Sequence, residues 1–555
     1  MLRELQEEQL RVNMKIRRCL IIISLFVISI LTACTEKVGP YGVKINEDLT
    51  TTNIIDDNYR NYYEIYVGGF YDSNKDKTGD LKGVIQKLDY IKNLGFNGIW
   101  LMPINLSGSY HKYDVMDYYQ IDSSYGTMAD LEKLIEECHK RDIKLILDLV
   151  LNHSSSNHAW FASARNAYEK YLAGMALTEE EEKFKDFYVF YPSKGDIPAT
   201  KTCYQVSGKT YYYEANFSSN MPEFNCDSPY VQEEFQKIIN FYLDKGVDGF
   251  RLDAVKYYYV DSQTKNIEFL SKINEWIKNA NPNAYVVAEC WDSATTITEY
   301  YRSGIDSFFN FSASIDNSSS PIINSINLEG KMLNKYYAGL VANLEMANGH
   351  IPAPFLDNHD TPRFTTSGEN LRNTKFQYAL LQMMNGSTFT YYGDEVGMVG
   401  SNAGTLPDEN VRLPMRWGED NKVGDCKMLA GITTSNYPHG KVKEQMTSED
   451  SLYNFYKKVL LIRNQNPEIA RGEISLVEMV REDDGDKKLI IKKTYNDSTI
   501  GIIFNFSPTR DLSVDYKSLG FNEVIGQIVV DNLDKYIGIK DGALYMPPYS
   551  IAVVK

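Results

Sequence analysis

The sequence predicts an α/β protein built on a (β/α)8 TIM barrel, with an insertion domain after the third strand and an antiparallel β domain at the C-terminus. Eight short apolar runs alternate with amphipathic stretches between Tyr63 and Gly472. These runs are apolar throughout, which is typical of parallel strands that are covered on both faces. An eightfold β–α alternation over about four hundred residues has the size of a barrel with insertions.

The eight strand candidates follow one another in chain order. They read EIYVGGF, NGIWLMPI, IKLILDLVLNH, VDGFRLDAV, AYVVAEC, DSFFNFS, APFLDNHD and STFTYYGDE. Between the first two runs, apolar residues recur at helical spacing, at Leu81, Val84, Leu88, Ile91 and Leu94. We expect that helix to end at Gly95, because glycine commonly follows the last helical turn. A second helix is expected over MADLEKLIEECHKR.

Two segments do not fit the barrel, which we assign to residues 61–471. Residues 153–220 form a long polar and aromatic stretch between the third and fourth strands, and we expect them to form an insertion domain B. After residue 472 the helical pattern stops, and EISLVEM, KLIIKKTY, TIGIIFNFS and YSIAVVK follow. Such runs are typical of antiparallel strands, so residues 472–555 are predicted to form a C-terminal β-sandwich.

The N-terminus is predicted to be a signal peptide, residues 1–33, with Met14 as a possible true start. A basic stretch precedes an apolar run of about fifteen residues, too short for a membrane span. Leu31-Thr32-Ala33-Cys34 resembles a bacterial lipobox, so Cys34 is expected to carry the lipid and residues 34–60 to form a lipid-anchored linker. This predicts a bacterial lipoprotein on the extracytoplasmic face of the cell membrane. The alternative is an uncleaved anchor helix.

Composition narrows the class of partner. The formal net charge is −16 and the pI is near 5.1, which argues against a nucleic-acid partner. Outside the signal peptide, five cysteines at scattered spacing form no disulfide framework and no metal motif. A Cys203–Cys226 disulfide is left open. So is the oligomeric state, for which a monomer is the default expectation.

Acidic residues stand at the C-terminal ends of four predicted strands, the edge at which barrel enzymes hold their active sites. They are Asp148, Asp253, Glu289 and Asp360. Arg251 and Asp253 point the same way along one strand, so the guanidinium is expected to hold Asp253 ionised. Glu289 is framed by apolar residues, which should raise its pKa. Any one acid could serve in a salt bridge, but the set together predicts glycoside hydrolysis.

Six motifs in register resemble glycoside hydrolase family 13, the α-amylase family. DLVLNH, GFRLDAVKY, VAECW and FLDNHD resemble its four signature regions in order and spacing. MPEFN resembles its fifth region, and TFTYYGDEVGM its strand-eight segment. The resemblance runs from about residue 63 to residue 472 and is nearest to lipoprotein α-amylases of the group between oligo-1,6-glucosidases and neopullulanases.

The resemblance implies a retaining mechanism and a role for each matching residue. Asp253 is implied to be the nucleophile, Glu289 the acid/base and Asp360 the transition-state stabiliser. The residues implied to bind the sugar at the cleavage subsite are Tyr113, His153, Arg251, His359, Asp408 and Arg412.

The stretch YDSNKDKTGDLKG carries oxygen-bearing side chains at every second position. It is not an EF-hand, because Lys77 and Gly83 stand where Gly and Glu are needed. Many family members carry a calcium loop at this place, which implies a Ca²⁺ site formed by the side chains of Asp72, Asn74, Asp76 and Asp80 and the carbonyl of Thr78. A solvated loop is the alternative. A second calcium site of the family stays open, since only Asn152 matches its usual ligands.

The leading interpretation is an α-amylase that cleaves α-1,4-glucosidic bonds in starch-like glucans and maltooligosaccharides. One alternative is an α-glucosidase, oligo-1,6-glucosidase or transglucosylase of the same family. Another is a catalytically inactive glucan-binding or membrane-partner protein, which the intact acidic set disfavours. The sequence leaves open endo against exo action, chain-length and branch preference, and hydrolysis against transfer.

Overall fold

The computed structural model describes most of the chain beyond the N-terminal segment. The residues described are 9, 39–314, 318, 320–325, 333, 349–365, 371–402, 408–419, 424–428, 432–478, 487–531 and 534–555, with the side chains of 325 and 476–478 excepted. The predicted signal peptide, apart from residue 9, and the lipidation site Cys34 lie outside them. Within these ranges no helix is both long enough and apolar enough to cross a membrane.

Eight parallel strands form the central sheet, in the order β13-β12-β11-β10-β6-β3-β2-β14. Their bounds are β2 (Asn61–Ile65), β3 (Gly98–Leu101), β6 (Lys144–Leu149), β10 (Gly249–Leu252), β11 (Tyr285–Ala288), β12 (Ser307–Asn310), β13 (Ala353–Pro354) and β14 (Thr388–Tyr391). A parallel bridge between Phe355 and Phe389 joins the two edges and closes the barrel. Seven of the strands lie within their predicted runs, and β2 begins three residues before the run EIYVGGF and overlaps it at Glu64 and Ile65. The predicted fold class is confirmed.

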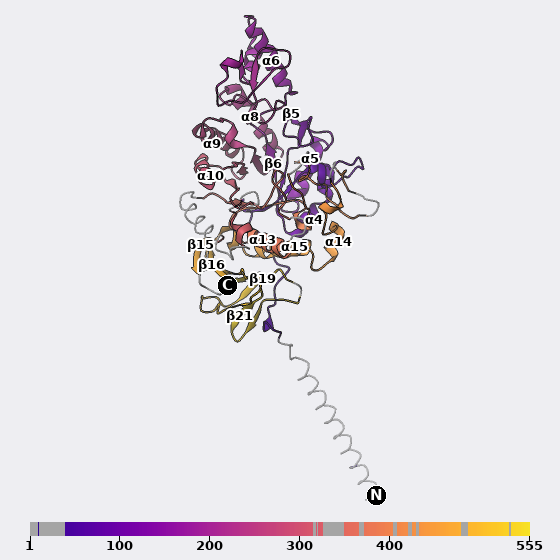
Figure 1. The fold of residues 1–555 in the computed structure, drawn as a ribbon, viewed down its shortest axis with the longest axis vertical. Coiled ribbons are helices and arrows are strands. Elements are labelled where there is room, and N and C mark those ends of the chain that lie inside the picture. The colour runs from indigo at the N-terminus through magenta and orange to yellow at the C-terminus, as the bar shows by residue number, and fades with distance from the viewer. Residues whose placement is uncertain are drawn as a thin grey trace.

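Helices connect the strands and surround the sheet (Figure 1). They include α3 (Leu81–Gln86), α4 (Leu88–Leu94), α5 (Met128–His139), α8 (Pro229–Asp244), α9 (Gln263–Ala280), α10 (Ala294–Tyr300), α11 (Pro321–Ser325), α13 (Leu371–Gln382) and α15 (Leu452–Gln465). The first predicted helix is interrupted at Lys87, and its second part ends at Gly95, whose φ of 110° is in the left-handed region that glycine adopts readily.

The barrel interior is packed with aromatic side chains. Tyr62 stacks on Tyr285 and on Phe389, with ring centroids 5.3 and 4.8 Å apart. Because side chains alternate along a strand, Tyr62 and Glu64 face the same side of β2. The aromatic layer therefore lies beneath the polar residues that end the strands, and part of the tyrosine content serves the core.

The insertion domain lies at one end of the long axis (Figure 1) and carries α6 (Ala159–Leu172) and α7 (Glu179–Lys185). Its small antiparallel sheet consists of β7 (Phe190–Tyr191), β9 (Tyr212–Glu214) and β8 (Cys203–Gln205). Bridges from His153 to Glu223 and from Tyr188 to Phe224 hold this domain against the barrel's third strand end.

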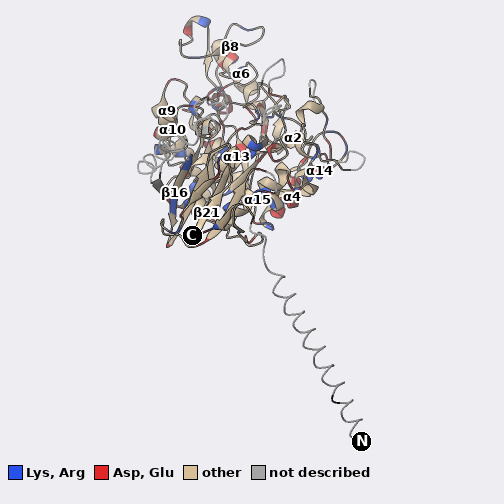
Figure 2. Ribbon diagram, turned by 60° about the horizontal axis from the view of Figure 1, so that its bottom comes forward, with Lys and Arg blue, Asp and Glu red and all other residues tan. Residues whose placement is uncertain are grey.

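The C-terminal domain packs two antiparallel sheets against each other (Figure 2). One sheet has the order β15 (Glu473–Glu478), β16 (Lys488–Tyr495), β17 (Ser498–Asn505), β22 (Ser550–Val554) and β19 (Val524–Val529). The other has the order β1 (Val43–Lys44), β20 (Gly538–Lys540), β21 (Ala543–Met546) and β18 (Leu512–Val514). Part of the segment expected to be a linker thus contributes a strand to the C-terminal domain.

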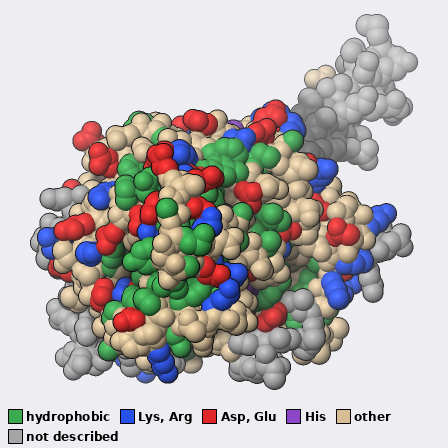
Figure 3. Space-filling view, turned by 90° about the horizontal axis from the view of Figure 1, so that it is seen from above, with side chains coloured by type: hydrophobic (Ala, Val, Ile, Leu, Met, Phe, Trp, Pro, Cys, Tyr) green, Lys and Arg blue, Asp and Glu red, His purple; other side chains and the backbone are tan. Residues whose placement is uncertain are grey.

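The remaining described elements are short. Besides several three-residue 3-10 helices, they are α2 (Val67–Phe70), the hairpin of β4 (Asn105–Ser107) and β5 (Val115–Ile121), α14 (Val442–Thr447) and α16 (Glu468–Arg471). Seen from the side of the insertion domain, the surface mixes acidic, basic and hydrophobic side chains (Figure 3).

Candidate active site

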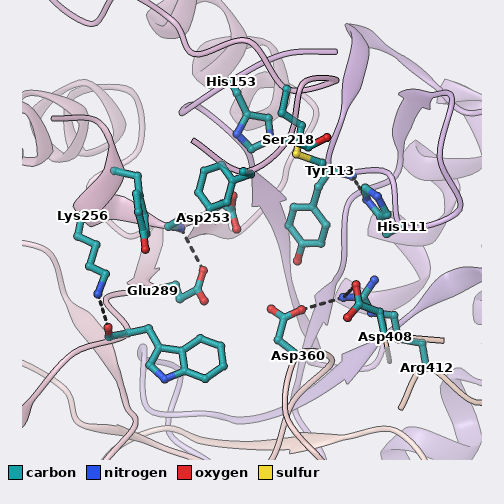
Figure 4. A pocket seen from close by; sticks show the side chains of 15 residues that line it. His111, Tyr113, His153, Ser218, Asp253, Lys256, Glu289, Asp360, Asp408 and Arg412 are labelled. Carbon is teal, nitrogen blue, oxygen red and sulfur yellow. Dashed lines mark hydrogen bonds and ion pairs between the residues drawn. The ribbon is translucent and has the colours of Figure 1, made fainter. Parts of the chain in front are cut away.

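A cavity of about 680 Å³ opens at the carboxyl ends of the barrel strands (Figure 4). Nine residues were predicted to be catalytic or to bind the substrate. Seven of these nine line the cavity: Tyr113, His153, Asp253, Glu289, Asp360, Asp408 and Arg412. The other two, Arg251 and His359, are buried beneath its surface. The structure therefore brings all predicted catalytic and substrate-binding residues into one site.

The Arg251 guanidinium joins the acids of three neighbouring strands. Arg251 in β10 pairs in register with Asp148 in β6, and its Nη1 donates to Asp148 Oδ1 at 2.9 Å. The same Nη1 contacts Asp253 Oδ1 at 2.5 Å, and Nη2 contacts Glu289 Oε2 at 2.6 Å. One rigid, planar cation thus fixes Asp253 and Glu289 side by side.

The backbone around β10 permits this closeness. Gly249 opens the strand, and a Cβ there would lie only 1.9 Å from the Tyr285 carbonyl oxygen, so only glycine lets β10 approach β11 in this way. At the strand's other end, Ala254 has a φ of 43°, an uncommon conformation that occurs at functional sites. This turn directs the Ala254 N–H to Glu289 Oε2, at 3.0 Å.

Burial has the largest effect on the pKa of each of the two carboxyls. It raises the pKa of Glu289 to about 7, against the opposing charge of Arg251 and with help from Asp253 and Asp360. This confirms the expected direction. For Asp253, the Arg251 guanidinium favours the ionised form as expected, but burial has the larger effect, and the net pKa of Asp253 is raised from its ordinary value. The sequence shows the partner but not the depth of burial.

Asp360 lies between two cations. Its Oδ1 accepts a hydrogen bond from Arg412 Nη2 at 2.7 Å, and its Oδ2 lies 2.9 Å from His359 Nε2. Although burial opposes ionisation, these two neighbours lower the pKa of Asp360. Asp360 is therefore an ionised carboxylate at neutral pH, placed at the cleft opposite Glu289 (Figure 4).

The remaining predicted binding residues differ in how tightly they are held. The Tyr113 hydroxyl donates to Asp148 Oδ2 at 3.0 Å, which fixes its ring at the cleft. Both ring nitrogens of His153 are buried without a hydrogen-bond partner among the described residues, and burial lowers its pKa to about 4. The neutral His153 ring can therefore bond a ligand hydroxyl. Asp408 is half-exposed, 3.8 Å from Arg412.

Eight further residues line the cleft but were not assigned a substrate contact from the sequence: His111, Phe217, Ser218, Met221, Ala254, Lys256, Tyr257 and Trp291. Lys256 and Tyr257 directly follow the Asp253 motif, and Trp291 comes two positions after Glu289, so their proximity to the acids was a usable signal. Phe217 comes from the insertion domain, and its ring packs against the ring of Tyr257, with the two ring centroids 5.0 Å apart. No local pattern marks it.

The predicted calcium loop folds on itself through Asx turns. Asp72 Oδ1 accepts from the Asn74 N–H at 3.1 Å, and Asp76 Oδ1 accepts from the Thr78 N–H at 2.8 Å. Asp80 caps α3 by accepting from the Gly83 N–H at 2.7 Å. No group of three His, Cys, Asp or Glu side chains in the described part of the chain converges as a metal cluster. The oxygen donors are still of the kind that Ca²⁺ prefers, since each carboxylate has further lone pairs free.

The sequence left open a Cys203–Cys226 disulfide and a second calcium site at Asn152. Cys203 and Cys226 are both free thiols. At the second calcium position, the Asn152 amide donates to the Asp253 carbonyl at 2.7 Å, while its buried Oδ1 has no partner among the described residues.

A closed barrel with a carboxyl of raised pKa beside a second acid at its carboxyl edge has the groups that a glycoside hydrolase needs. Residues 64–472 match the family model described as alpha amylase, catalytic domain. The chain belongs to this α-amylase family, glycoside hydrolase family 13, which confirms the resemblance.

Similar proteins extend over nearly the whole chain. The chain is 35% identical over 510 residues to "Alpha-amylase 3" of Dictyoglomus thermophilum, with 90% of this chain and 93% of that protein covered. It is 28% identical over 531 residues to an oligo-1,6-glucosidase of Parageobacillus thermoglucosidasius, covering 79% and 90%. Among solved structures, Eubacterium rectale Amy13B superposes with a TM-score of 0.82 at 38% identity, covering 91% and 97%.

Proposed function

We propose that this glycosidase works by a retaining mechanism with Asp253 as nucleophile, Glu289 as acid/base and Asp360 as transition-state stabiliser. The observation that carries it is the Arg251 guanidinium bonded to Asp253 and Glu289 together. Retention needs two carboxyls only about 5–5.5 Å apart. Two acids that share one planar donor group suit that separation.

Each proton has a place in this mechanism. The Asp253 carboxylate attacks the anomeric carbon while Glu289 gives its proton to the departing glycosidic oxygen. Glu289, now ionised, takes a proton from water, and that water attacks the same carbon and releases Asp253. Two inversions return the original anomer. The ionised Asp360 favours the positive charge that develops on the sugar ring between the two steps.

We further propose that the substrate is an α-1,4-linked glucan such as starch or a maltooligosaccharide. An α-amylase is the relative at 35% identity that spans most of both chains. An α-1,6-directed or exo-acting glucosidase is the second candidate, because several relatives at 25–28% identity are oligo-1,6-glucosidases. The aromatic side chains Phe217, Tyr257 and Trp291 at the cleft suit stacking against glucose rings in either case.

On amylose we expect viscosity to fall faster than reducing ends accumulate, with maltooligosaccharides of mixed length appearing first. Internal cleavage shortens a chain with few cuts, whereas an exo enzyme releases many small sugars before the polymer shrinks. Timed chromatography beside reducing-end assays measures both. Isomaltotriose is the matched α-1,6 substrate and should be cleaved poorly. If glucose is the sole early product, or if isomaltotriose is cleaved faster than amylose, the glucosidase proposal replaces the amylase proposal.

We propose that the loop of Asp72, Asn74, Asp76, Thr78 and Asp80 binds Ca²⁺ as a structural ion. Its residues are local to one turn and do not touch the reacting groups, so bound metal should stabilise the fold by mass action. Chelation is expected to lower Tm clearly while it lowers the activity at room temperature only slightly.

The matched variant for this test is Asp76→Asn, which removes one exposed carboxylate from the loop. Its Tm should no longer respond to chelator. Elemental analysis should find calcium in the wild type and less in the variant. An unchanged wild-type melting curve after chelation, together with no bound metal, would leave the solvated loop as the correct interpretation.

We also propose that Cys34 is lipidated and holds the enzyme on the outer face of the cell membrane. The lipobox-like Leu31 to Cys34 and the short apolar run before it support this. When Cys34→Ser is expressed in a bacterial host that processes lipoproteins, the protein should leave the membrane fraction or remain there as an unprocessed precursor. Mature wild-type protein without an acyl mass by mass spectrometry would contradict the proposal.

A further inference from the structure

A buried acid lies behind the cleft that the chemistry described so far does not use. Glu64 stands in β2 with 1% of its side chain exposed, and its Oε1 contacts His359 Nδ1 at 2.5 Å. On the other side of the same ring, Nε2 lies 2.9 Å from Asp360 Oδ2 and 2.6 Å from the Tyr113 hydroxyl oxygen. Tyr113 gives its own proton to Asp148, so this oxygen accepts from the histidine.

Both ring nitrogens of His359 therefore face oxygen acceptors. A neutral imidazole carries one N–H and could satisfy only one side, whereas an imidazolium donates from both. The ring itself is fully buried and packs edge-on to Trp100, so it is not open to bulk water. The geometry favours a proton on each nitrogen, provided that Glu64 and Asp360 are ionised.

The surrounding charges agree with this. The charged or titratable groups around His359 are Glu64, Asp148, Asp253, Asp360, Tyr113, Arg251 and Arg412. Acids outnumber arginines in this set, and an imidazolium supplies the third cation. Although burial disfavours the charged ring, Asp360 and Glu64 raise the pKa of His359 to about 10.

We propose that Glu64 is a positioning residue for the glycosidase reaction: it holds His359 as an imidazolium, and His359 in turn keeps Asp360 ionised and aimed into the cleft. A buried carboxylate that orients a ring and stabilises its charged form is an established arrangement in other enzymes. Glu64 does not line the cleft, and its side-chain hydrogen bond toward the site is the one to His359. The proposal rests on the cleft described above but not on which glucan is cleaved.

Without the Glu64 charge, the ring faces Asp360 with one anion fewer behind it. His359 should then lose its proton nearer neutral pH, and Asp360 should lose a charged partner. Because Asp360 acts on the charge that appears only in the transition state, kcat should fall more than KM rises.

The test titrates His359 by NMR in full-length protein labelled at histidine, of which the chain has seven. His359→Gln assigns the signal. In the wild type we expect the imidazolium signal to persist above pH 8. In Glu64→Gln the titration should move down by at least about one pH unit, and kcat should fall about 10- to 100-fold with KM nearly unchanged. Glu64→Asp, which keeps the charge, should recover part of both.

Glu395→Gln is the matched control. Glu395 is equally buried, in the 3-10 turn that follows the neighbouring strand β14. It accepts hydrogen bonds from Tyr63 and Tyr90, and no contact with His359 is found among the described residues. It should leave both the titration and kcat unchanged. A wild-type His359 that is neutral at pH 8 would overturn the proposal, even if Glu64→Gln does not fold. So would a Glu64→Gln variant that loses activity while His359 titrates as before.

Discussion

Asp253→Asn is expected to lower kcat by about 10⁴-fold or more while the protein stays folded, because an amide cannot attack the anomeric carbon. The substitution keeps the shape of the side chain and an oxygen that can accept from Arg251. The loss of kcat should appear with every substrate, including one with a good leaving group, because every substrate must pass through the covalent step. Kinetics on maltooligosaccharides beside a melting curve measure the two effects separately.

The stereochemistry of the wild-type product checks the same assignment. NMR of the first products should show the α-anomer, which mutarotation converts only later. An initial β-anomer, or an Asp253→Asn variant that keeps a tenth of wild-type activity, would remove Asp253 from the nucleophile role. The natural control is Asp148→Asn, which also loses a carboxylate beside Arg251 but no attacking group, and it should retain more activity.

Glu289→Gln is expected to lower kcat on maltooligosaccharides by about 10³-fold or more, because the leaving oxygen then departs without a proton. With an aryl glucoside whose leaving group needs no proton, the first step should be largely restored. Measuring both substrates separates a lost acid from a damaged site. Equal losses on the two substrates would contradict the acid/base role.

The raised pKa of Glu289, about 7, gives this prediction a pH dependence. The acid must hold its proton, so wild-type kcat/KM should fall as pH rises through about 7, and Glu289→Gln should lose that limb. The contribution of Glu289 to the stability of the fold should also fall as pH rises. A carboxyl whose folded pKa lies above its ordinary 4.5 favours folding when protonated, and this advantage disappears between about pH 4.5 and 7. Glu289→Gln should therefore raise Tm at pH 8 and change it little at pH 4.

Much of the site was predictable because each catalytic acid stands where a buried apolar run ends. A parallel barrel brings such ends to one edge whatever the loops do, so Asp253, Glu289 and Asp360 had to meet. The pairing of Glu64 with His359 joins residues 295 positions apart and depends on the barrel closing. Its only local signal was a charged residue inside the buried run NYYEIYV.

Other features depend on quantities that a motif does not contain. The net pKa of Asp253 is a balance between burial and Arg251, and the motif shows only the second. Phe217 reaches the cleft because the insertion domain folds back through the His153–Glu223 bridge. The pairing of β1 with β20 could not be foreseen either, since two residues of VK in a polar segment carry no strand pattern.

That β1–β20 pairing limits how far the enzyme can stand from a membrane. Val43 lies nine positions after Cys34, and an extended chain spans at most about 3.3–3.6 Å per residue, so a lipid on Cys34 would hold the C-terminal domain within roughly 30 Å of the bilayer. The insertion domain lies at the opposite end of the molecule (Figure 1). Such a mounting would leave the insertion-domain end of the enzyme free to meet polymers too long to be imported, while the short products are released near the cell surface.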